Sequence, residues 1–90
     1  MMQVEVIQKD LKTGGWSGRA WLLKAGDKYY VASGVVAMFS GPEVLVFETD
    51  DKGNPKSMSE VVGGRGISML EAVAMLGRSL ADKQTEAKQE

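Results

Sequence analysis

The sequence predicts an α+β domain in which an antiparallel four-stranded sheet is packed by one C-terminal helix. Three observations carry this prediction. Four β-rich runs alternate with turn residues, a capped amphipathic segment follows near the C-terminal end, and no long linker divides the 90 residues. Because the apolar stripe of the helix needs a partner, we expect it to lie across one face of the sheet.

The first two strands are expected near 2–9 and 19–25. In the first, Val4 and Val6 alternate with polar residues, which is the period-two pattern of a half-buried strand. In the second, Trp21 and its neighbours alternate in the same way between the two faces.

Two further strands are expected near 28–38 and 43–50. The first of these follows a short loop that contains Gly and Asp, so it forms a hairpin with the preceding strand. Gly34 within it suggests a β-bulge. The run Ser40-Gly41-Pro42 is a turn, because Gly allows positive φ and Pro cannot donate to a ladder. We expect residues 54–66 to be poorly regular.

A helix is expected from about Ser68 to Gln84. Ser68 and Glu71 have the spacing of a capping box, in which each side chain accepts a hydrogen bond from the backbone amide of the other residue. The buried stripe is expected to comprise Met69, Val73, Leu76 and Leu80, flanked by Leu70, Ala74, Gly77 and Ala81.

We expect residues 1–84 to form a single domain and residues 85–90 to form a polar C-terminal tail. The residues predicted to be buried are Val4, Val6, Leu23, Val31, Val44, Val46, Phe47, Met69, Val73, Leu76 and Leu80.

The composition argues against several classes of function. Eleven Lys and Arg against twelve Asp and Glu leave a net charge of -1, which disfavours general nucleic-acid or membrane-surface binding. The chain has no Cys and no His, so thiol nucleophiles, imidazole bases and zinc fingers are excluded. We therefore expect no catalytic residues, no metal and no cofactor. No apolar run approaches the roughly 20 residues of a membrane span, and we expect a cytoplasmic protein.

Gly63, Gly64, Arg65 and Gly66 precede the helix and form a candidate anion-binding loop. Successive amides beside a helix N-terminus could cradle a phosphate. The alternative is a flexible connection, which is favoured because neither a P-loop nor a Rossmann spacing is present.

Aromatic and basic residues are interleaved between residues 16 and 30. We predict that Trp16, Arg19, Trp21 and Tyr30 bind a partner, with Trp16 the most exposed ring. The alternative is burial, since strand alternation sends about half of such rings to the core, and Trp21 and one of the Tyr29-Tyr30 pair are expected there. One face of the sheet is expected to stay open and to keep Trp21 or Leu22 together with a Tyr, which favours a homodimer.

Asp50, Asp51 and Asn54 crowd a turn around Gly53. An EF-hand would need alternating oxygen ligands and a Glu at its twelfth position, and both are missing. We interpret this segment as a solvated turn.

The region from Tyr29 to Leu76 resembles small, mostly uncharacterised proteins encoded by phages and prophages. The shared features are the runs Tyr30–Ser33 and Ser40–Phe47, an Asp shortly before Gly53, the run Ser59–Val61 and an Ala-rich helix. The resemblance implies a non-enzymatic accessory protein that binds a protein partner, either a host factor or a defence component.

The order of four strands and a helix is also similar to the single-strand-binding repeats of the whirly and Pur-alpha type. Such proteins bind single-stranded nucleic acid by stacking bases on aromatic rings beside cations. The fourth-strand region is acidic here, through Glu43, Glu48 and Asp50, so nucleic acid is the less favoured partner.

Overall fold

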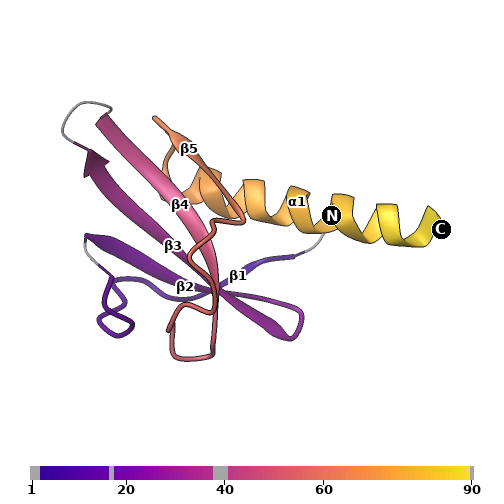
Figure 1. The fold of residues 1–90 in the computed structure, drawn as a ribbon, viewed down its shortest axis with the longest axis horizontal. Coiled ribbons are helices and arrows are strands. Elements are labelled where there is room, and N and C mark those ends of the chain that lie inside the picture. The colour runs from indigo at the N-terminus through magenta and orange to yellow at the C-terminus, as the bar shows by residue number, and fades with distance from the viewer. Residues whose placement is uncertain (1–2, 17, 38–40, 90) are drawn as a thin grey trace.

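The computed structural model describes residues 3–16, 18–37 and 41–89 (Figure 1). Within them, five strands form one antiparallel sheet in chain order, followed by a helix. The elements are β1 (Glu5–Gln8), β2 (Arg19–Ala25), β3 (Lys28–Ala37), β4 (Gly41–Thr49), β5 (Val62–Arg65) and α1 (Met69–Gln89). The predicted α+β class with an antiparallel sheet and a C-terminal helix is confirmed, but the strand count of four was wrong.

The fifth strand, β5, lies in the stretch that was predicted to be irregular. It pairs with β4, with Gly63 opposite Leu45 and Gly64 opposite Val44. A Cβ on Gly63 would lie 2.6 Å from Leu45 Cδ2 and 2.7 Å from the Val44 carbonyl oxygen. Glycine at this position therefore allows the close approach of the two strands. Because glycine has no apolar side chain, the alternating pattern that identifies a strand in the sequence is missing here.

The strand bounds differ from expectation mainly at the ends of the sheet. β2 has the predicted bounds, whereas β1 is shorter and its pairing with β2 shifts register between Val6 and Gln8. The bulge expected at Gly34 is absent, because Gly34 pairs in regular register with Arg19 and Val44. Residue 38, the predicted end of the third strand, and Ser40 of the predicted turn lie outside the described residues.

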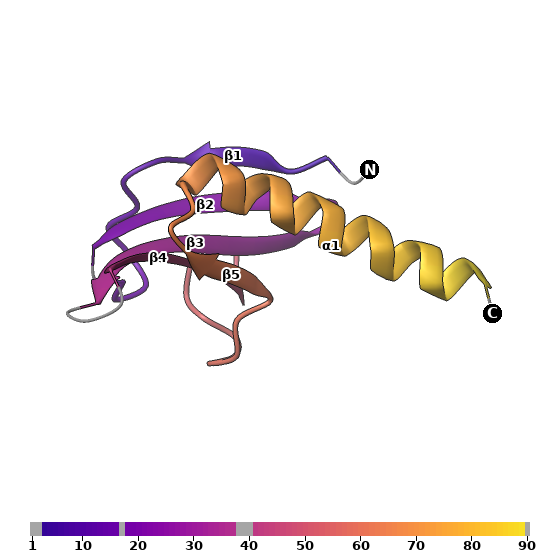
Figure 2. The same cartoon turned by 90° about the horizontal axis from the view of Figure 1, so that it is seen from above.

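The helix begins as the capping box predicts. The Ser68 amide donates to Glu71 Oε1 and the Glu71 amide donates to Ser68 Oγ, both at 3.1 Å. The helix ends at Gln89 rather than near Gln84, so residues 85–89 are helical and not an irregular tail. No Gly or Pro follows Leu80, and the residues there are mostly good helix formers. Figure 2 shows the helix crossing one face of the sheet and running on past the strands. In the described part of the chain, no helix has the length and apolar character needed to span a membrane.

The two faces of the sheet carry separate cores. On the face crossed by the helix, which we call the helix face, Leu76 packs with Leu23 and Val46, and all three side chains are fully buried. Ala72 and Ala32 are also buried there without exposed area, so small residues on both layers allow the helix to approach the sheet. The predicted flank is therefore partly wrong, since Leu70 and Ala74 are exposed.

The opposite face, which we call the loop face, is covered by the connection between β1 and β2. Leu11 from this connection packs with Ala20, Leu22 and Val31, which are all buried. The expected homodimer assumes an open face that keeps Trp21 or Leu22 together with a Tyr. Trp21, Leu22 and Tyr30 are all buried, so they do not provide such a face, and the homodimer stays a prediction.

Six of the residues predicted to be buried are buried, namely Leu23, Val31, Val44, Val46, Met69 and Leu76. The other five are only partly buried: Val4, Val6, Phe47, Val73 and Leu80. Val4 and Val6 lie at or beside an edge strand, and the remaining three side chains lie toward the margins of the two cores.

Candidate functional site

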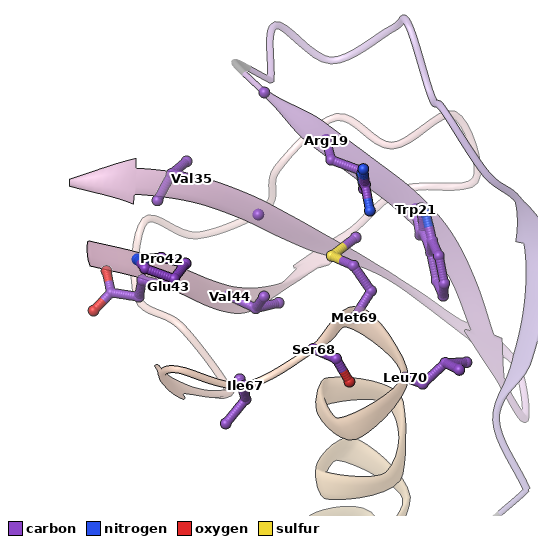
Figure 3. A pocket seen from close by; sticks show the side chains of 12 residues that line it. Arg19, Trp21, Val35, Pro42, Glu43, Val44, Ile67, Ser68, Met69 and Leu70 are labelled. Atoms are coloured by element: carbon purple, nitrogen blue, oxygen red, sulfur yellow. The ribbon is translucent and has the colours of Figure 1, made fainter. Parts of the chain in front are cut away.

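A groove opens on the helix face between the first turn of α1 and the ends of β2, β3 and β4 (Figure 3). Its volume is about 830 Å³. The side chains that line it are mostly apolar, and the polar ones are Arg19, Glu43 and Ser68. The apolar lining comprises Trp21, Val35, Pro42, Val44, Ile67, Met69 and Leu70. A concave surface of this size and composition is typical of a binding site.

Two glycines shape the floor of this groove. A Cβ on Gly34 would lie 3.3 Å from Met69 Sδ, so the absence of a side chain at Gly34 leaves room for Met69 at the start of the helix. Gly18 has a φ of +80°, and a Cβ there would lie 2.5 Å from the Gly34 carbonyl oxygen. The chain can therefore pass close to β3 as it enters β2 only with glycine at this position.

The exposed large aliphatic side chain at the groove is Leu70. Its exposed fraction is 66%, although it belongs to the first turn of a helix that packs on the sheet. The neighbouring Met69 is buried and points into the groove, as Figure 3 shows. Since successive helical residues point about 100° apart, the two side chains cannot both face the sheet. The pair Met69-Leu70 was the signal in the sequence that could have placed an exposed apolar residue here.

Arg19 supplies positive charge at the β2 end of the groove. Its side chain is exposed, and it makes no ion pair with any described residue. Lys9 adds a second cation, because its Nζ lies 4.9 Å from the centroid of the Trp21 ring. Glu43 lies at the other end of the groove, beyond Val44 and Met69 (Figure 3). The Glu43 carboxylate points away from Val44 and Met69, so the charge that faces the groove is positive and lies at its β2 end (Figure 3).

Trp21 and Tyr30, two predicted partner-binding residues, are buried in the core of the helix face. Their exposed fractions are 8% and 3%. Burial raises the pKa of the Tyr30 hydroxyl, and the carboxylates of Glu48 and Asp27 raise it further. Only the margin of Trp21 that lines the groove remains available to a partner. Alternation along β2 and β3 directs both rings toward the helix.

Trp16, the third predicted aromatic residue, lies on the other side of the sheet and is half-buried. Its Nε1 donates to the Gly53 carbonyl oxygen at 2.8 Å, and its ring lies 5.4 Å from the ring of Phe47. The expectation that Trp16 is the exposed ring was therefore wrong, because the loop that carries it folds back onto the sheet. Of the four predicted residues, the structure brings only Arg19 and Trp21 together in the groove.

The predicted anion-binding loop is not a loop. Gly63, Gly64 and Arg65 belong to β5, and the amide of Gly66 donates to the Pro42 carbonyl oxygen at 2.9 Å. The helix N-terminus beside it is occupied by the carboxylate of Glu71. The pairing of this segment with β4 and the capping of the helix N-terminus by Glu71 argue against the anion-site interpretation, which stays a prediction.

Asp50 organises the turn between β4 and β5. Its Oδ1 accepts from the amides of Lys52 and Asn54, and its Oδ2 accepts from the side-chain amide of Asn54. These hydrogen bonds to Asn54 and Lys52 lower the pKa of the Asp50 carboxyl. In residues 3–16, 18–37 and 41–89, no three acidic side chains gather in a way that could hold a metal ion.

The comparisons with known proteins give no relative. No protein-family model matches the chain, and no significant similarity to a curated protein or to a solved structure is found. The functional interpretation therefore rests on the groove and on the charges beside it.

Proposed function

We propose that this chain is a non-enzymatic binding protein that acts by contacting a protein partner through the groove at the start of α1. The observation that carries the proposal is Leu70, a large apolar side chain that is 66% exposed at the edge of an apolar groove. Exposing such a side chain to water is unfavourable, and contact with a partner would remove it from water.

The composition supports a binding role rather than catalysis. With neither His nor Cys in the chain, a general base or a nucleophile would have to come from a carboxylate, a hydroxyl or an amine. The carboxylates near the groove have other roles or lie apart, since Glu71 caps the helix and Glu43 lies at the far end.

The resemblance to phage and prophage proteins extends this proposal to the biological setting. An accessory protein of a mobile element would bind a host or phage protein in the cytoplasm. Recognition of single-stranded nucleic acid is the competing proposal, and burial of Trp21 and Tyr30 together with the packing of Trp16 disfavours it.

Capture of partners from host lysate tests the proposal, with and without nuclease. We expect a stoichiometric protein partner that survives nuclease and is lost with Leu70→Asp. The matched control is Met58→Asp, since Met58 is 86% exposed but does not line the groove. Loss of the partner with both variants, or retention of nucleic acid alone, contradicts the proposal.

A further inference from the structure

We infer that the groove takes a partner segment in which a large apolar side chain lies close to a carboxylate. The apolar side chain lies against Met69 and Val44, and the carboxylate pairs with Arg19. This inference rests on the proposed function and adds the chemistry of the partner to it.

The distribution of charge selects an acidic segment. Arg19 carries a guanidinium that is exposed and free of ion pairs with described residues, and it lines the groove directly. A guanidinium presents two parallel N–H donors to a carboxylate, so it fixes the direction as well as the charge of its partner. The ammonium of Lys9 over the Trp21 ring raises the positive potential at the same end.

The position of Arg19 sets the orientation of the bound segment. Arg19 lines the β2 end of the groove, and Met69 and Val44 lie farther along it (Figure 3). A carboxylate of the partner is attracted toward Arg19, so the acidic residue lies over β2 and the apolar residue over the middle of the groove.

The middle of the groove provides an apolar surface for one large side chain. Met69 and Val44 are buried in the core beneath it, and Leu70 stands exposed at its edge. Gly34 lets the Met69 side chain pack closely on the backbone of β3, because a Cβ there would approach Met69 Sδ to 3.3 Å. Methionine adapts its shape easily, so the floor can adjust to Leu, Ile or Phe of the partner.

A peptide segment fits these features better than a nucleic acid. Nucleic-acid binding would need several cations along a backbone and exposed rings for stacking, whereas this groove offers Arg19, the nearby Lys9 and the margin of Trp21. Apolar walls with one positive end complement an apolar residue next to an Asp or Glu.

The test uses three short peptides: acetyl-Leu-Leu-Asp-amide, acetyl-Leu-Leu-Asn-amide and acetyl-Leu-Leu-Lys-amide. Each is titrated into the full chain at low salt, and the shifts of the Gly34, Val44 and Met69 amide resonances are followed by NMR. We expect the Asp peptide to bind about two- to fivefold more tightly than the Asn peptide, and the Lys peptide to bind most weakly. With Arg19→Glu, the order is expected to reverse, and with Arg19→Gln the preference for the Asp peptide over the Asn peptide should decrease to the small part that Lys9 supplies.

The outcomes separate this inference from the proposed function. Equal binding of all three peptides at the groove would leave the groove as a docking site but overturn its preference for an acidic segment. Shifts confined to residues outside the groove, or none at millimolar peptide, would overturn the inference, while partner capture with Leu70→Asp still decides the proposed function. Arg19 is exposed at the start of a strand, so unchanged circular dichroism spectra of its variants are expected and serve as the folding control.

Discussion

The two faces of the sheet are buried by different means. On the helix face, one regular helix covers the strands, and its buried residues recur at helical spacing from Met69 through Ala72 to Leu76. On the loop face, an irregular connection places Leu11 and Trp16 over the strands, and hydrogen bonds to the turn between β4 and β5 hold it there. The contacts of the helix recur along its whole buried side, so each residue supplies only part of the stability. The contacts of the loop depend on the conformation of a few single residues. The faces should therefore differ in how they respond to substitution.

The largest effect is expected on the helix face. Leu76 has no exposed area and packs between α1 and the sheet, so Leu76→Asp would place a charge in an apolar core and should unfold the protein. Loss of the circular dichroism signal and of a cooperative thermal transition would show this. Ala74→Asp is the control, since Ala74 is exposed on the same helix. An unchanged melting temperature for Leu76→Asp would contradict the placement of the helix.

A smaller but position-specific effect is expected on the loop face. Gly14 has a φ of +87°, and a Cβ there would lie 2.3 Å from the Gly53 carbonyl oxygen. Gly14→Ala should therefore cost more than about 2 kcal/mol of unfolding free energy, since a left-handed backbone and a clash with the main chain add together. Gly15 has a φ of +75° with nothing within 4 Å, so Gly15→Ala should cost only the strain of about 1 kcal/mol. Equal losses in denaturant titrations of the two variants would show that docking of the loop is not tight.

The same contrast explains which parts of the fold were predictable. The helix, its capping box and the strands β2 and β3 follow from periodicity and turn chemistry that are local in the sequence. The coverage of the loop face depends on contacts between residues near 14 and 53, and β5 depends on pairing of glycines with β4. Contacts between residues that are far apart in the sequence produce no periodic pattern from which they could be predicted.

The candidate site was only partly predictable for a related reason. Arg19 and Trp21 were recognised because aromatic and basic residues cluster around them in the sequence. Leu70 was assigned to the flank of the helix, since an amphipathic pattern predicts which face is apolar but not where the sheet ends beneath it. The groove arises at that end, where β3 and β4 run on past the first turn of the helix (Figure 2).

Trp16→Phe probes the loop face at a single hydrogen bond. The substitution keeps a ring to pack on Phe47 and removes the Nε1 donor to the Gly53 carbonyl oxygen. We expect a loss of about 1 kcal/mol in unfolding free energy, which is typical of one hydrogen bond. Tyr29→Phe is the control on the same face, because it keeps the ring and should change stability little. A neutral Trp16→Phe would assign the role of Trp16 to ring packing alone.

The smallest effect is expected from Asp50, which orders the turn that the loop docks against. Hydrogen bonds from Asn54 and Lys52 lower the pKa of its carboxyl in the folded state below the ordinary value of 3.8. A lowered pKa in the folded state means that the ionised carboxylate stabilises the fold at neutral pH, and this contribution is lost as the pH falls from about 3.8 through the lowered value. Asp50→Asn should therefore melt slightly below the wild type at pH 7, and the difference should disappear in acid. Asp51→Asn, at the neighbouring exposed position, should follow the wild type more closely at both pH values. If the difference between Asp50→Asn and the wild type were instead constant from neutral pH into acid, the hydrogen bonds of the turn would not depend on the charge of Asp50.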